Sequence, residues 1–451
     1  MSSPSRVLSG WGNYPRQLCQ LRRPERYAAL SPMTMQQIAR GMGRSYGDAA
    51  LNDIGEVVLT ERLRRILDFD RVNGLLRAEA GLSLDELLDV VVPAGWFPRV
   101  TPGTRFVSLG GCFAADVHGK NHHRDGSFAG TVSTMTLIDA SGTEHHCSAG
   151  ENAEYFHATS GGMGLTGFIG ELSVQLCPIE TAWMQVRHLP CVDLAHSLRM
   201  LEDPALDAQY SVAWLDLMAR GEQLGRGVLM LGEHATREML PHIKPEQQLT
   251  SGRPGRLGVP FYPPAGLINP LTIGAFNQLY YRLQARRQQT FYCHYQPFFY
   301  PLDGLANWNR LYGKPGFLQY QCVLPAAQAE AGFGQLLGQL HKSGHPAFLG
   351  VLKRLGEEGA GMLSFPRSGY TLAMDLPFTG ESLLALLEAF DEIVLAHGGR
   401  VYLAKDARLA ASRMPAMYPR LGEWQAVRRQ LDPQGCFQSS LSRRLGLEES
   451  S

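Results

Sequence analysis

The stretch RGMGRSYGD, residues 40–48, places three glycines beside two arginines and a serine. Glycine permits the left-handed backbone conformations in which successive N–H groups point to one spot, and such a nest binds anions. Arg40, Arg44 and Ser45 add positive charge and a hydroxyl donor. The stretch therefore predicts a phosphate-binding loop, although one such loop taken singly is as often an ordinary polar turn.

Two more glycine-rich stretches follow within the first 170 residues. The first, TPGTRFVSLGG at 101–111, leads into HGKNHH at 118–123. The second, at 162–167, matches GxGxxG, but a predicted helix (Ala153–Ala158) precedes it and a predicted alternating strand (Phe168–Leu176) follows it. A Rossmann site needs the reverse order, so we reject that interpretation. What remains is a structural turn or a backbone loop that lets a flat ligand pass closely.

The histidines of HGKNHH suggest a metal site, but the pattern argues against one. Gly119 and Asn121 interrupt any helix that would bring His118, His122 and His123 to one face, and no cluster of Cys or carboxylates follows. We therefore expect no metal, and we interpret the segment as the polar rim of an active site.

Composition excludes several classes. Lys+Arg (42) balance Asp+Glu (42), which disfavours a strongly basic nucleic-acid binder. Eight cysteines form no CxxC pair, and neither a P-loop nor a GxSxG elbow occurs. No apolar leader and no run of about 18 apolar residues is visible, so we expect a cytoplasmic protein. The chain has only six lysines but 36 arginines. We therefore single out Lys120, Lys353 and Lys405 as positions where a planar guanidinium group would not replace a compact ammonium group.

Periodicity predicts an α+β protein whose second half forms a separate domain. Expected strands and helices are Glu56–Leu59, Leu75–Ala78, a capped helix Ser83–Ala94, a hairpin over 135–147, strands Phe317–Leu324, Ala347–Lys353 and Tyr370–Leu376, and helices Ala326–His341 and Glu381–His397. Residues 251–301 are rich in Pro, Gly, Tyr and Phe, and we expect a long irregular, mobile loop there.

Taken together, the three glycine-rich stretches resemble the FAD domain of the vanillyl-alcohol oxidase superfamily. Within it, HGKNHH, LSFPRSGYTLAMDLP (363–377) and YLAKDARLAASRMPAMYPRLGEW (402–424) resemble one family. That family is the oxidase subunit of decaprenylphosphoryl-β-D-ribose 2′-epimerase. The likeness runs from about Gly10 to Leu447, nearly the whole chain.

The resemblance implies a two-part, PCMH-type FAD-binding domain formed by residues 1–180 and 400–451. The substrate domain, 181–399, would hold an antiparallel sheet flanked by helices, with the mobile loop at about 251–301. Some superfamily members tether the flavin through a His in the first loop; Arg44 stands here instead, so we expect non-covalent FAD. The implied cofactor-binding residues are Arg40, Gly41, Met42, Gly43, Arg44, Ser45, Tyr46, Gly47, Asp48, Gly103, Ser108, Leu109, Gly110, Gly111, Ala115, Asp116, Val117, His118, Ile169 and Tyr402.

The resemblance also implies the activity. The enzyme would oxidise the 2′-hydroxyl of a polyprenyl-phosphoryl β-D-ribose to a 2′-keto sugar, which a separate NAD(P)H-dependent short-chain reductase would reduce with inverted configuration. Because the implied substrate is a lipid, we expect the protein to make peripheral contact with a membrane. The implied site residues are Lys405, His118 and Tyr46 for catalysis and Lys120, Gln321 and Lys353 for substrate binding.

One position departs from the family, and two other functions stay open. Actinobacterial members carry Cys where this chain has Ala373. This removes a thiol from the pocket and leaves the exact lipid-sugar open. The alternatives are a soluble alditol or aldonolactone oxidase that uses oxygen, and a non-catalytic flavoprotein or sugar-binding module.

Overall fold

The first half of the chain builds two sheets. The computed structural model describes residues 4–26, 30, 35–252, 257–263, 268–287 and 289–448. A four-stranded sheet has the order β1-β2-β4-β3, in which β4 runs parallel to both neighbours, and a six-stranded antiparallel sheet has the order β5-β6-β10-β8-β9 with β7 paired to β10. The strands are β1 (Ser5–Ser9), β2 (Arg16–Arg22), β3 (Gln37–Arg40), β4 (Glu56–Leu59), β5 (Ile66–Asp70), β6 (Leu75–Glu79), β7 (Trp96–Pro98), β8 (Val132–Ile138), β9 (Glu144–Cys147) and β10 (Phe168–Pro178).

Local sequence signals determine several of these elements. Helix α1 (Leu84–Val91) begins at the predicted capping box: the Ser83 hydroxyl accepts from the backbone N–H of Glu86 (3.2 Å), and the Glu86 carboxylate accepts from the N–H of Ser83 (3.3 Å). The predicted hairpin is present as β8 and β9. The remaining helices of this half are α2 (Leu109–Ala114), α3 (His122–Asp125) and α4 (Ala153–Thr159).

The second half forms one eight-stranded antiparallel sheet. Its order is β15-β11-β13-β12-β18-β19-β17-β20. The strands are β11 (Trp183–Cys191), β12 (Tyr210–Leu215), β13 (Gly227–His234), β15 (Phe291–His294), β17 (Phe317–Leu324), β18 (Gly350–Leu355), β19 (Gly369–Pro377) and β20 (Arg400–Val401). Helices α5 (Leu194–Glu202), α9 (Ala326–Ser343) and α10 (Glu381–Ala396) cover one face of it. The expected α+β class is confirmed.

The prediction of one long irregular loop over 251–301 was wrong. The segment contains α7 (Pro270–Ala285), which begins at an Asn269 capping box, then strand β15 and α8 (Tyr295–Phe299). The 16-residue helix escaped sequence analysis because its apolar residues do not form a stripe facing the core. Short elements nearby are α6 (Pro245–Gln248), β14 (Leu257–Gly258), β16 (Leu305–Ala306) and the 3₁₀ helices η5 (Pro301–Gly304) and η6 (Trp308–Tyr312).

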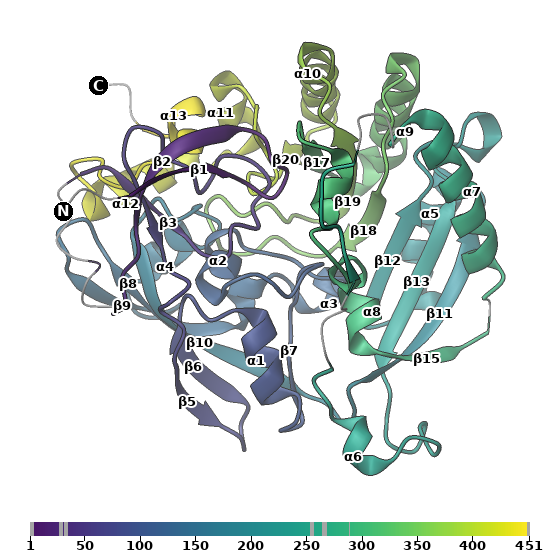
Figure 1. The fold of residues 1–451 in the computed structure, drawn as a ribbon, viewed down its shortest axis with the longest axis horizontal. Coiled ribbons are helices and arrows are strands. Elements are labelled where there is room, and N and C mark those ends of the chain that lie inside the picture. The colour runs from purple at the N-terminus through teal and green to yellow at the C-terminus, as the bar shows by residue number, and fades with distance from the viewer. Residues whose placement is uncertain are drawn as a thin grey trace.

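The C-terminal segment returns from the large sheet to the first half of the chain. β20 pairs with β17, after which α11 (Met414–Met417), α12 (Leu421–Leu431) and α13 (Ser440–Arg444) lie over the N-terminal strands (Figure 1). The Arg428 guanidinium donates to the carbonyls of Leu165, Phe437 and Leu447 and so joins the third glycine-rich loop to the end of the chain. None of the described helices combines the length and apolar character needed to cross a membrane.

Candidate active site

One cavity is lined by all three glycine-rich stretches and by one face of the large sheet. Its sheet wall is a row of paired residues: Gln321 on β17 lies opposite Ala373 on β19, which lies opposite Val351 on β18. The side chains of neighbouring strands alternate in register, so these three point to the same face. That face is opposite to α9 and α10, because the adjacent Tyr320 points the other way and contacts Phe390 of α10.

The first glycine-rich stretch is the loop that follows β3. The backbone N–H groups of Met42, Gly43, Arg44 and Ser45 donate to no other atom in the part of the chain that the structure describes. Gly43 has a φ of 63°, and a Cβ added there would lie 2.4 Å from the Arg40 guanidinium. The loop is thus a run of unpaired donors in a conformation that glycine adopts without strain, which is how an anion-binding nest is built.

The second stretch contributes a wall with fewer available donors. Ser108 caps α2, and its hydroxyl accepts from the N–H of Gly111 (3.3 Å). The N–H groups of Leu109 and Gly110 already donate to backbone carbonyls (2.9 and 2.8 Å). The first loop therefore offers the larger set of unpaired donors, while the second brings its backbone close to whatever the cavity holds.

Gln321 and His118 join the two halves of the chain inside the cavity. The Gln321 amide donates to Nε2 of His118 (3.0 Å) and to Oγ1 of Thr371 (3.1 Å). This bond requires a neutral His118 with its proton on Nδ1. Burial, then the nearby charge of Lys353, holds the pKa of His118 well below its usual value. Nδ1 is buried without a partner among the described residues, and a bound ligand would satisfy such a donor.

Two of the three predicted lysines reach this cavity. Burial lowers the pKa of Lys405 to about 7 and that of Lys353 to about 8. The Lys405 ammonium lies 3.8 Å from the centre of the Tyr46 ring. Lys120 does not line the cavity. Its ammonium donates to the backbone carbonyl of Phe298 and lies 4.2 Å from the centre of the Phe298 ring.

A buried carboxylate near Lys405 was missed by sequence analysis. Asp375 accepts from the Gln319 amide (2.5 Å) and from the Tyr312 hydroxyl (3.5 Å). Burial raises its pKa to about 6, and the positive charge of Lys405 opposes that rise. An aspartate within the otherwise apolar run YTLAMDLP was the available signal, because a fully buried carboxylate needs partners. Trp11, with its ring 3.9 Å from the Arg44 guanidinium, was also missed.

Most predicted site residues line the cavity. They are Gly41, Met42, Gly43, Arg44, Ser45, Tyr46, Gly103, Ser108, Gly110, Gly111, Ala115, Val117, His118, Ile169, Gln321, Lys353, Tyr402 and Lys405. Their individual roles stay predictions.

Six predicted residues lie outside the lining: Arg40, Gly47, Asp48, Leu109, Asp116 and Lys120. The charged groups of three of these residues form hydrogen bonds or ion pairs that hold the loops in place. Arg40 donates to the carbonyl of Ser9 (2.7 Å), Asp48 pairs with Arg444 (2.7 Å), and Asp116 accepts from the Ser364 hydroxyl (2.5 Å). A sequence motif identifies the loop, but it does not separate residues that face the ligand from those that hold the loop in place.

Of the HGKNHH histidines, only His118 lines the cavity. His122 Nδ1 accepts from the N–H of Gly356 (3.0 Å), and His123 Nε2 lies 3.0 Å from the carbonyl of Ala208. The predicted polar rim is therefore limited to one histidine. Within the described residues, no group of three or more His, Cys, Asp or Glu side chains is arranged to hold a metal.

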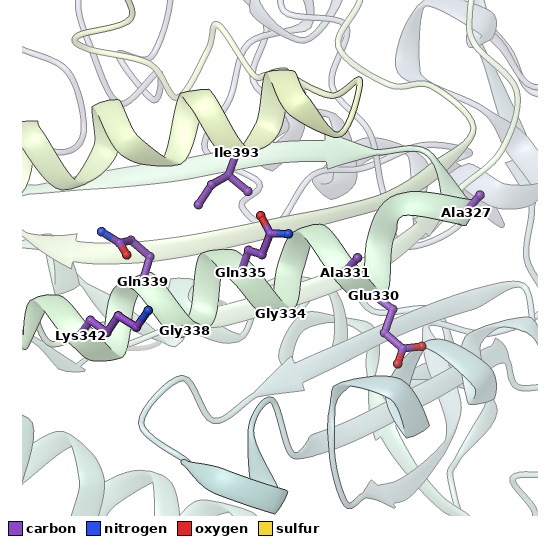
Figure 2. A pocket seen from close by; sticks show the side chains of 9 residues that line it. All are labelled: Ala327, Glu330, Ala331, Gly334, Gln335, Gly338, Gln339, Lys342 and Ile393. Atoms are coloured by element: carbon purple, nitrogen blue, oxygen red, sulfur yellow. The ribbon is translucent and has the colours of Figure 1, made fainter.

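A second hollow lies on the outside of the molecule, along α9. Figure 2 shows its lining, eight residues of α9 and Ile393 from the neighbouring α10. Gly334 and Gly338 leave space beside α10, and Glu330 and Lys342 supply the only charges. The hollow lies on the face of the sheet opposite to the cavity and contains no cluster of reactive groups.

The amino-acid sequence is similar to those of known flavin-dependent proteins. Residues 26–148 match the family model of an FAD binding domain, and residues 372–445 match that of D-arabinono-1,4-lactone oxidase. The decaprenylphosphoryl-β-D-ribose oxidase of Mycolicibacterium smegmatis is 38% identical over 91% of this chain and 89% of its own length. The chain belongs to the decaprenylphosphoryl-β-D-ribose oxidase family.

The chain is also similar to two further proteins. An uncharacterized protein of Streptomyces coelicolor is 36% identical over 81% of this chain and all of its own length, and the L-gulonolactone oxidase of Scyliorhinus torazame is 30% identical over 31% of each chain. The expectation of an FAD-dependent oxidoreductase with an FAD-binding domain is confirmed. The free donors of the first loop and the unpartnered His118 Nδ1 are groups that such a cofactor would satisfy.

Proposed function

We propose that this protein oxidises the 2′-hydroxyl of a polyprenyl-phosphoryl β-D-ribose to the 2′-keto sugar, the first half of an epimerisation to the arabinose form. The observation that carries the proposal is the shared cavity, which is lined both by the nest of backbone donors at 42–45 and by His118, Gln321, Lys353 and Lys405. Such a lining would suit a phosphate-bearing cofactor together with polar groups that bind sugar hydroxyls. FAD would accept the hydride from C2′, and the hydroxyl proton would pass to water or a base.

The chain's own residues have separable roles in this proposal. The loop 41–45 would bind the diphosphate of FAD, and the wall at Gly110, Ala115 and Tyr402 would lie along the rest of the cofactor. Gln321 is held by His118 and Thr371, so its amide has a fixed orientation toward a sugar hydroxyl. Lys405 and Lys353 would supply positive charge. Lys120, predicted to contact substrate, instead fixes the carbonyl of Phe298 and would act on substrate only through that segment.

We expect the flavin to be bound without a covalent bond. The Arg44 side chain stands at the tether position, donates to the carbonyl of Phe106 (3.1 Å) and cannot form the histidine–flavin linkage. Acid precipitation of the purified yellow protein should release the flavin into the supernatant, measured by its absorbance. Flavin that stays in the washed pellet would contradict the prediction.

The substrate class is tested by anaerobic bleaching of the flavin. We expect polyprenyl-phosphoryl ribose to bleach it, and free pentoses, alditols and aldonolactones to leave it oxidised. The weaker candidate, a soluble alditol or aldonolactone oxidase, rests on the match of residues 372–445, and it predicts the opposite ranking with oxygen as acceptor. Flavin that no sugar reduces would indicate a non-catalytic flavoprotein.

The 2′-keto product implies a second enzyme. A short-chain reductase that uses NAD(P)H would return hydride to the opposite face of C2′. We also propose that the protein works in the cytoplasm at a membrane surface, because a long prenyl chain is not free in water.

A further inference from the structure

Helix α7 exposes several large apolar side chains to solvent. Its protein-facing side combines the buried Ile273 with polar contacts: the Asn277 amide donates to Asp216 (2.8 Å), and Gln278 accepts from Arg226. The solvent side carries Leu271, exposed by 85%, and Leu279, exposed by 58%. Surface helices turn most of their large apolar side chains toward the core, so several such side chains on the solvent side indicate that this side contacts something other than water.

Further exposed apolar residues lie on α7 itself and on a segment that precedes it in the chain. Phe276 and Leu283 are exposed on the same helix, by 47% and 50%, and Leu257 and Phe261 are exposed by 76% and 67% on the segment 257–263. That segment is held in place: β14 pairs with β16, and the Arg310 guanidinium of η6 donates to the carbonyls at 259 and 260 (3.0 and 2.9 Å). We call these exposed apolar residues of 257–263 and α7 the apolar face.

Helix α7 lies on the same side of the large sheet as the cavity. In the sheet, Val351 of the cavity wall lies opposite Trp214, and Tyr280 of α7 packs on Trp214 with ring centres 4.7 Å apart. Phe276 also contacts Phe348, 5.6 Å between ring centres, two residues before the start of β18. α7 therefore covers the same face of the sheet as the cavity, mainly over β13 and β11, at the right edge of Figure 1.

The charge of this region is one-sided. From Gln247 to Leu302 the sequence has no Asp or Glu but five Arg, in a chain whose formal net charge is zero. Arg282 and Arg286 lie on the exposed side of α7, one turn apart and beside Leu283. Apolar side chains bordered by arginines, without acids, match the interface of an anionic bilayer. Two copies of this face would repel each other, which disfavours self-association.

We propose that the apolar face of 257–263 and α7 docks the enzyme on an anionic lipid bilayer. Leucine and phenylalanine side chains would enter the interfacial region, and the arginines would contact lipid phosphates. The cavity would then open near the membrane surface, where a polyprenyl-phosphoryl sugar presents its headgroup. The choice of substrate rests on the proposed function; the docking itself does not.

The test uses the FAD-bound full chain and vesicles without substrate. We expect wild-type protein to float with vesicles of phosphatidylglycerol and phosphatidylethanolamine, to bind phosphatidylcholine vesicles weakly, and to be released by salt. Replacing Leu271 and Leu279 with Glu should lower vesicle partitioning by about tenfold or more, since two apolar anchors become anions facing an anionic surface.

Matched controls separate docking from general hydrophobicity. Val72, exposed by 85%, and Leu18, exposed by 62%, lie in the first half of the chain, and the Val72→Glu/Leu18→Glu variant should bind like wild type. Equal binding by both double variants, or no wild-type binding to anionic vesicles, would overturn the proposal. Concentration-dependent dimers that the α7 variant abolishes would assign the face to self-association instead.

A second readout distinguishes this proposal from the proposed function. With a water-soluble, short-prenyl phosphoryl ribose and no vesicles, the Leu271→Glu/Leu279→Glu variant should reduce its flavin at the wild-type rate. If that sugar fails to reduce even wild-type flavin, the proposed substrate is wrong, while the vesicle result stands on its own. A slow variant in this vesicle-free assay would mean that α7 serves the cavity directly, and docking would be rejected.

Discussion

Replacing Lys405 with alanine should leave FAD bound and slow sugar-dependent flavin reduction by about 10²–10⁴-fold. The Lys405 ammonium lies over the Tyr46 ring and near the Asp375 carboxylate, within the cavity that we assign to flavin and sugar. A cation placed there would stabilise negative charge that develops during hydride transfer and would add little before it. Stopped-flow flavin reduction under anaerobic conditions measures the effect.

Two further variants sharpen this prediction. Lys405→Arg should rescue poorly, because a wide planar fork does not replace a compact ammonium against a ring. Lys342→Ala, at an exposed position on α9, is the control and should behave as wild type. A Lys405→Ala rate within a factor of about three of wild type, a loss of less than about 1 kcal/mol of activation free energy, would end the proposal.

The rate should also depend on pH through this residue. Burial lowers the pKa of Lys405 to about 7, so the ammonium is fully present below that pH and is lost as pH rises through it. If the ammonium is the active form, flavin reduction should fall above pH 7, and the fall should be absent from the Lys405→Ala variant. A rate that rises through the same window would instead identify the neutral amine as a base.

The second large effect is expected at Gly43. Gly43→Val should abolish FAD retention, because a branched side chain cannot adopt φ of 63° without strain and its Cβ would meet the Arg40 guanidinium. The nest of N–H groups at 42–45 would be distorted. The ratio of flavin to protein absorbance after gel filtration reports the loss.

Gly221→Val is the matched control for this variant. Gly221 has a nearly identical φ of 62°, but a Cβ there would have no atom within 4 Å, and the residue lies away from the cavity. It should therefore lose some stability from backbone strain and keep full flavin. If Gly43→Val also keeps full flavin, the first loop does not bind the cofactor.

Local signals were sufficient for much of the fold. The Ser83–Glu86 capping box predicted the start of α1, and the two-residue periodicity of 317–324 predicted β17 to the residue. Both depend on interactions within a few residues. Helix α7 failed the same test because its apolar residues are not confined to one side: Ile273 is buried next to the polar Asn277, whereas Leu279 faces outward.

The site was predictable at the level of loops and less so at the level of atoms. The motif around residues 40–48 identified the nest, but whether Asp48 faces a ligand or Arg444 depends on a segment almost 400 residues away. Sequence analysis grouped Lys120 with Lys405 because lysines are rare in this chain. In the structure, the Lys120 ammonium instead donates a hydrogen bond to the carbonyl of Phe298. Asp375 was missed because its partners come from other strands and from η6, which no local pattern encodes.

The return of the C-terminal segment has a consequence for synthesis on the ribosome. Arg444 pairs with Asp48 beneath the first loop (2.7 Å) and with Asp406 (2.8 Å), and the N–H of Tyr46 donates to the carbonyl of Ala404 (3.0 Å). A nascent chain that has emerged only as far as residue 400 contains every glycine-rich loop but none of these contacts. Flavin capture should therefore follow translation of this last segment, so that stalled chains stay colourless although their first 180 residues are complete.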